Sequence, residues 1–157
     1  MNRREEILAR VREIPALPVS VNRVIHLIQK EDSSIADIMT ALQADAGLTT
    51  EVLKLANSAY FAGPRRIANL REAGVLLGTA RVQQLVLAAA ISPLATPPLR
   101  GYDLPAGQLL DHLLSVAIGA ECLATTLGIA APSHAFTAGL LHDIGKIVLG
   151  TFIEVDA

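Results

Sequence analysis

The chain has 157 residues, enough for one compact domain and too few for two of ordinary size. Its net charge of −2 gives no electrostatic support for nucleic-acid binding, and its single cysteine, Cys122, excludes an internal disulfide and a cysteine-based metal cluster. Hydrophobic residues make up 52% of the chain and aromatic residues only 3%, so we expect a core of small aliphatic side chains with Cys122 buried among them.

The charge pattern also bears on where the protein works. The first residues alternate charged and apolar side chains and contain no signal-peptide core. Arg81 and Glu121 interrupt the most apolar stretches, so we expect none to reach the roughly 20 residues of a membrane span. We therefore expect a cytoplasmic protein that binds neither a membrane nor nucleic acid.

Apolar residues recur with the period of an α-helix, and sustained two-residue alternation is absent, which predicts an all-α fold. The first expected helix carries an apolar stripe from Ile7 to Ile14 and ends at Pro15 and Pro18. Ser20 can cap the helix that follows, because its hydroxyl can accept a hydrogen bond from a first-turn amide.

Capping signals mark the starts of further helices. Ser34 and Asp37 have the spacing of a capping box, and Asp45 or Ala46 can open the helix after that. Asn69 begins a second capping-box pair, three residues before Glu72. Five helices are therefore expected before residue 70 or beginning near it, with a loop over residues 58–67.

Glycine and proline divide the second half of the chain. Gly78 should end a short helix, and the next helix should run until Pro93. Four prolines within residues 92–107 indicate a linker. A helix over about 108–127 and a second one, capped by Ser133 and running to about Leu149, should form an antiparallel hairpin. We therefore predict a helical bundle of two lobes: a subdomain at 1–92, a linker at 93–107 and a hairpin subdomain at 108–157.

Candidate metal ligands lie in this hairpin. His142 and Asp143 stand between aliphatic pairs, where a polar pair is costly to bury unless it is bonded or ligated. Imidazole and carboxylate groups bind ions such as Fe, Mn, Zn or Mg. His112 is the candidate third ligand, because its axial offset from His142 across the hairpin is about 10 Å or less.

Simpler interpretations remain open for each of these residues. The His142–Asp143 pair could satisfy backbone groups near a helix end, and Lys146 could interact with the helix dipole in a last turn. His26 and His134 have no partner at ligand spacing and are expected at the surface. The helices on either side of residues 45–47 suggest a helix-turn-helix, but the second of them offers a single cation to phosphates, which disfavours DNA binding.

The order of several motifs resembles one known family. His112, the His142–Asp143 pair and the glycine and lysine at 145–146 look like the HD superfamily of metal-dependent phosphohydrolases. Three further segments resemble its HDOD branch: LANSAYF at 55–61, AGVLLG at 73–78 and IPALP at 14–18. The likeness extends from about Ile14 to Leu149, and it implies an N-terminal HDOD-specific helical subdomain followed by a truncated HD-like hairpin.

The HDOD resemblance also implies functions. It makes His112, His142 and Asp143 metal ligands for Mn, Fe, Mg or Zn, and Lys146 a group able to contact a substrate phosphate. Catalytic HD enzymes need a further aspartate from a later helix, and Asp156 is too close to Asp143 to serve. The resemblance therefore implies a non-catalytic signalling module that acts through partner proteins. The alternative is a phosphohydrolase acting on a nucleotide second messenger.

Mean hydropathy adds an expectation about assembly. Its value of +0.45 is apolar for a soluble domain. We therefore expect an open docking surface and self-association as a symmetric dimer.

Overall fold

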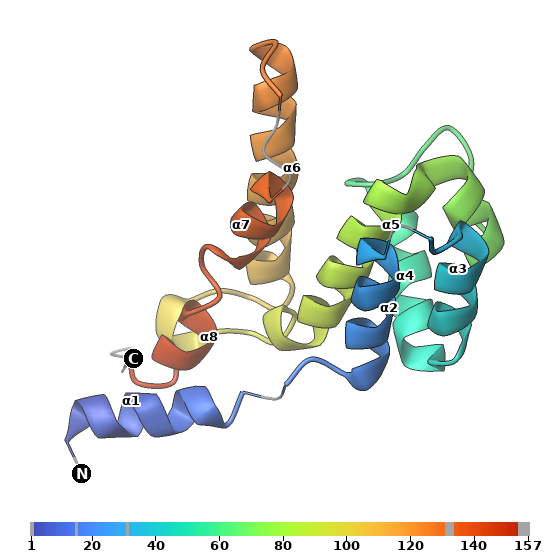
Figure 1. Cartoon of the computed structure of the whole chain (residues 1–157). Helices are drawn as coiled ribbons and strands as arrows, with labels where there is room; N and C mark the ends of the chain where they lie inside the picture. Colours follow the sequence, from blue (N-terminus) through green and yellow to red (C-terminus); the bar gives the residue numbers. More distant parts are fainter. Residues whose placement is uncertain (1, 15, 31, 131–133, 154–157) are drawn as a thin grey trace. The chain divides into compact units, whose positions relative to one another are not determined.

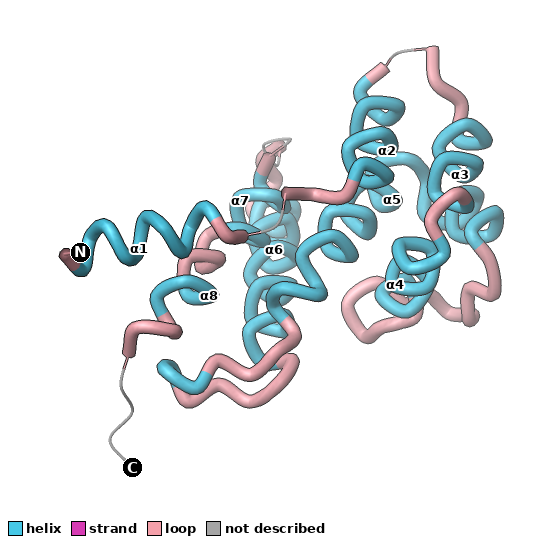
Figure 2. The backbone as a smooth tube through the Cα atoms, turned by 90° about the horizontal axis from the view of Figure 1, so that it is seen from below, coloured by secondary structure: helices cyan, strands magenta, loops and turns pink. Residues whose placement is uncertain are grey.

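A computed structural model of the chain describes residues 2–14, 16–30, 32–130 and 134–153. The predicted roles of Pro15, Ser133 and Asp156 lie outside these residues. The all-α fold is confirmed, and no strand occurs within the described ranges (Figures 1 and 2). The helices are α1 (Arg3–Arg12), α2 (Val19–Gln29), α3 (Ile35–Gln43), α4 (Ala46–Ala56), α5 (Leu70–Ala95), the 3-10 turn η1 (Arg100–Tyr102), α6 (Gln108–Thr126), α7 (Ala135–Leu141) and α8 (Lys146–Leu149).

The chain divides into two compact units. One comprises residues 17–92, and the other comprises residues 1–16 together with 93–157. Helix α1 therefore groups with the C-terminal residues and packs against α8. None of the residues of α1 is buried, and Leu8 and Val11 are about half exposed. The apolar stripe of this helix is therefore largely exposed, because α8 is only four residues long and covers little of it.

Helices α2, α3 and α4 pack in sequence around an aliphatic core. The predicted caps of α3 and α4 are confirmed: Ser34 and Asp37 form a reciprocal capping box, and the Asp45 carboxylate accepts the Leu48 amide at 2.9 Å. Ser20 is not a cap, because its hydroxyl donates to Asp45 at 2.6 Å and α2 begins one residue earlier. The Leu48 amide first, and then the Ser20 hydroxyl, lower the pKa of Asp45.

Helix α5 has the predicted interruption at Gly78, but it does not end at Pro93 as predicted. Gly78 has φ 73° and ψ 172°, a left-handed backbone that favours glycine, as expected for a helix interruption. The helix nevertheless continues through Pro93 to Ala95. Ile91 and Ala95, on either side of Pro93, are both buried. Their packing therefore outweighs the one backbone hydrogen bond that a proline removes.

Two helices, α5 and α6, meet the length and composition criteria of a membrane span. By length and composition alone, α5 and α6 could each cross a membrane, which contradicts the expectation that no stretch is long enough. Core helices of globular domains meet the same criteria, and each of these two helices has part of its surface buried inside the protein.

Helices α6 and α7 form the expected antiparallel hairpin, but its second arm is not one helix to Leu149. Helix α7 ends at Leu141, and α8 starts at Lys146. In a continuous helix the Gly139 carbonyl would accept the Asp143 amide. Here that carbonyl lies 2.7 Å from His142 Nδ1, and tighter bonds such as Lys146 N to Asp143 O at 3.0 Å form the turn.

The short α7 leaves the end of α6 uncovered (Figure 1). Leu123 and Leu127 lie on this uncovered end and are 60% and 62% exposed. Cys122 is exposed rather than buried, for the same reason.

A close backbone approach holds α7 against α6, and it can be tested by adding one methyl group. A Cβ at Gly139 would lie 2.6 Å from Ala117 Cα and 2.8 Å from its nitrogen. We expect Gly139→Ala to lower the free energy of unfolding in urea by about 1–3 kcal/mol, because the two helices must separate.

Gly119→Ala is the matched control. A Cβ there would meet nothing within 4 Å, so the variant should gain about 0.5–1 kcal/mol in helix propensity. Equal stability of the two variants would contradict a tight α6–α7 contact.

Candidate metal centre at the α6–α7 hairpin

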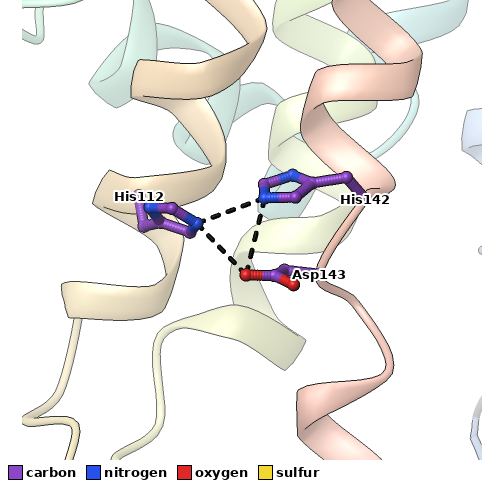
Figure 3. A group of neighbouring side chains, drawn as sticks. All are labelled: His112, His142 and Asp143. Carbon is purple, nitrogen blue, oxygen red and sulfur yellow. Dashed lines mark hydrogen bonds and ion pairs between the residues drawn. The ribbon is translucent and has the colours of Figure 1, made fainter.

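The structure brings three predicted site residues together: His112 on α6, and His142 and Asp143 directly after α7 (Figure 3). We call them the His–Asp cluster. His112 Nε2 lies 3.2 Å from His142 Nε2 and 3.2 Å from Asp143 Oδ2, and His142 Nε2 lies 3.5 Å from the same oxygen. The three ligand atoms all fall within 4.8 Å of one another. The expected register of the hairpin is therefore confirmed.

The end of α7 determines how His142 points. Its Nδ1 atom lies 2.7 Å from the Gly139 carbonyl oxygen, which can only accept a hydrogen bond. In the neutral imidazole the proton therefore sits on Nδ1, and the lone pair on Nε2 faces His112 and Asp143. A backbone carbonyl on the far ring nitrogen is the usual way in which proteins orient a metal-ligating histidine.

Lys146 neutralises the one carboxylate of the cluster. Its ammonium group donates to Asp143 Oδ2, the same oxygen that faces both imidazoles. The Lys146 hydrogen bond is the main cause that lowers the pKa of Asp143, and the charges of Lys146 and His142 add to it. Lys146 Nζ also lies 5.8 Å from the centre of the Tyr102 ring, within cation–π range.

The cluster is open to solvent. The His112 side chain is 47% exposed and that of Asp143 is 27% exposed. The His142–Asp143 pair is therefore only partly buried, and it lies at a helix end, as the simpler interpretation expected. A hollow of about 210 Å³ lies beside the cluster and is lined by His112 and Lys146 together with Leu104, Gln108 and Leu109.

The chemistry of the cluster fits one divalent ion. Two imidazole nitrogens and one carboxylate oxygen match the three protein ligands that metal sites with an open position use. Within the residues that the structure describes, no other group of three or more His, Cys, Asp or Glu side chains converges in this way. Lys146 and any ion would compete for Asp143 Oδ2.

Other predicted candidates lie away from this cluster. His26 and His134 are exposed, as expected, and His134 occupies the N-cap position of α7. The sequence analysis missed Gly139 and Tyr102, which support His142 and Lys146 respectively. The spacing of Gly139 three residues before His142 was an available signal for the first. Tyr102 comes from a distant turn that no pattern connects to Lys146.

Comparisons with known proteins agree with the all-α fold. The sequence pattern of the family described as the HDOD domain matches residues 14–157. A solved protein from Shewanella amazonensis that bears a provisional phosphohydrolase name is 33% identical, with a TM-score of 0.70 over 93% of this chain. A solved HDOD domain protein of unknown function from Geobacter sulfurreducens is 26% identical, with a TM-score of 0.65 over 94% of this chain.

A curated relative, an uncharacterised protein of Treponema pallidum, is 29% identical over 143 residues. The chain covers 27% of that protein, and it covers 51% of each of the two solved chains. It therefore spans about a quarter to a half of the length of these relatives.

Proposed function

The chain belongs to the HDOD domain family, and from that premise we propose that it is a non-catalytic module of bacterial signal transduction. In this proposal it works in the cytoplasm and acts through contacts with regulatory or signalling protein domains. The observation that carries the proposal is the charge of the His–Asp cluster. Its single carboxylate is already paired with an ammonium group from the same chain.

This charge balance disfavours hydrolysis that depends on two metal ions. Such a reaction needs both ions held firmly, so that the attacking water and the leaving oxygen are oriented together. The described residues offer two neutral imidazoles and one carboxylate that Lys146 neutralises. This ligand set provides no net negative charge to retain two dications.

We also propose that the cluster holds one divalent ion, Mn, Fe, Mg or Zn, with low affinity. When bound, such an ion polarises a phosphoryl oxygen or activates a water molecule. His112 and His142 would present their Nε2 atoms, and the Gly139 carbonyl would keep the His142 ring in position. Asp143 would have to exchange the Lys146 ammonium for the ion, and this exchange lowers the affinity.

A metal-dependent phosphohydrolase acting on a nucleotide second messenger is the second candidate. Two observations favour it: the ligand atoms converge within 4.8 Å, and Lys146 stands beside a hollow in which a phosphate could contact it. The provisional name of the Shewanella relative points in the same direction.

A hydrolysis assay separates the two candidates. We expect no turnover of cyclic or linear nucleotides when the purified chain is incubated with Mn, Fe or Mg, because the cluster cannot hold two ions. Product formation is measured by chromatography, with Asp143→Ala as the matched control. Turnover in the wild-type chain that disappears in Asp143→Ala would overturn the non-catalytic proposal.

A thermal melt tests metal binding without relying on activity. Binding at several times Kd adds about 1 kcal/mol by mass action, which corresponds to a rise of about 2–4 °C in Tm. We expect this rise with excess Zn or Mn, its loss in His142→Ala, and its retention in His26→Ala, which changes an exposed histidine of α2. Unfolding of the wild-type chain by a chelator would instead show that the metal is structural.

We further propose that the uncovered end of α6 mediates self-association as a symmetric dimer. Leu123, Leu127 and Ile129 are each more than half exposed there, and twofold dimers are the commonest symmetric assemblies. Light scattering at high concentration should give twice the monomer mass, and Leu123→Lys with Leu127→Lys should give the monomer mass. A monomer in the wild-type chain at every concentration would exclude the dimer.

A further inference from the structure

A cationic surface lies on the unit of residues 17–92, away in sequence from the His–Asp cluster. The loop between α4 and α5, drawn in green in Figure 1, borders two adjoining hollows of about 650 and 430 Å³. Asn57 and Arg66 line both hollows, Lys54 lines the first and Arg65 lines the second. From residue 57 to residue 71 the chain carries three arginines and no acidic residue.

Asn57 gives this loop a defined conformation. Its side-chain amide donates to the carbonyls of Leu53 and Ile67, both at 2.8 Å, and its side-chain oxygen accepts the Ile67 amide at 2.8 Å. The hydrogen bonds of the half-buried Asn57 side chain therefore join the two ends of the loop. Arg65 and Arg66 directly precede Ile67, so they lie next to the residue that these hydrogen bonds hold in place.

Asn57 also reduces the repulsion that the carbonyls at the end of α4 would exert on an anion. The C-terminal carbonyls of a helix carry partial negative charge, which repels anions. At the end of α4 the Asn57 backbone amide points at the carbonyls of Leu53, Lys54 and Leu55. Ser58 donates to the Leu55 carbonyl through its backbone amide at 2.9 Å and its hydroxyl at 2.7 Å. These three carbonyls at the end of α4 therefore already accept hydrogen bonds from the chain.

The cations of the loop are available to a ligand, and the nearby acids are not. Arg65 and Arg66 are exposed, and neither makes an ion pair or hydrogen bond with any residue that the structure describes. Glu51 accepts the Ser92 hydroxyl at 2.6 Å and lies 3.3 Å from Lys54, whose side chain remains 67% exposed. Glu72 bonds within the cap of α5, to Ala68 and Asn69.

We propose that Arg65 and Arg66, assisted by Lys54, bind the phosphate groups of a small phosphorylated molecule such as a nucleoside polyphosphate. A guanidinium group has a rigid fork of N–H donors that matches two phosphate oxygens at once, and paired arginines on a braced loop present two such forks. This site goes beyond the proposed function, because it would give a signalling module a ligand site built from residues other than those of the His–Asp cluster.

The shape and composition of the surface favour a compact ligand over a long polyanion. Two adjoining hollows can receive a phosphate chain and the group attached to it. Binding of an extended nucleic acid relies on many phosphate contacts, and the net charge of this chain is −2. Single-stranded nucleic acids also need exposed aromatic platforms, whereas the two aromatic residues of this loop, Tyr60 and Phe61, are half-buried and buried.

Calorimetric titration of the full chain with inorganic pyrophosphate and with ATP tests the proposal. We expect both probes to bind, adenosine not to bind, and Arg65→Ala with Arg66→Ala to weaken binding at least roughly 10-fold, which corresponds to about 1.4 kcal/mol. Arg23→Ala with Arg81→Ala removes two exposed arginines from α2 and α5 of the same unit, so it matches the change in charge and should leave the affinity unchanged.

A second double variant, Arg65→Lys with Arg66→Lys, keeps the positive charge and removes the paired N–H donors of the guanidinium groups. It should bind with intermediate affinity, and circular dichroism will verify that each variant is folded. Three results would overturn the proposal: no binding of pyrophosphate or ATP, an equal loss in the Arg23 and Arg81 control, or binding of heparin or DNA without binding of pyrophosphate.

Discussion

The approach of α7 to α6 leaves room for only a hydrogen atom at position 139, and the geometry of the His–Asp cluster depends on that contact. Because Gly139 lies against the Ala117 backbone, the two helices are close enough for His112 to face the residues that follow α7. The Gly139 carbonyl then bonds His142 Nδ1 rather than continuing the helix. One small residue therefore sets the separation of the helices, the end of α7 and the orientation of an imidazole.

Electrostatics then determine what the assembled cluster can do. One carboxylate and one ammonium cancel, so with neutral imidazoles the cluster and Lys146 together carry no net charge. Partial solvent exposure weakens each interaction further, because water screens charges at these distances. Good ligand geometry is thus combined with little electrostatic attraction for a cation. The loop that carries Arg65 and Arg66 is the reverse case, since these two arginines have charge and no ion-pair partner among the residues that the structure describes.

The sequence predicted local features well and the extent of packing poorly. Capping boxes such as Ser34–Asp37 and the interruption at Gly78 depend on a few neighbouring residues, so their patterns were sufficient. The exposure of Cys122 and Leu123 depends on the length of a different helix, which a stripe on α6 cannot indicate. For the His–Asp cluster, the antiparallel register could be estimated from helical rise. The turn after Leu141 could not, because no pattern indicated that the His142 side chain bonds the Gly139 carbonyl.

The hydrogen bonds of the His142–Asp143 pair give it a structural role that needs no metal. His142 Nδ1 bonds the Gly139 carbonyl of α7, and Asp143 accepts Lys146, which begins α8. Both interactions connect the end of one helix to the start of the next, so the pair organises this turn with or without an ion. An ion at the cluster would have to displace Lys146 from Asp143 and so disturb the start of α8. By linkage, the factor by which a bound ion weakens the Lys146–Asp143 contact equals the factor by which that contact weakens binding of the ion.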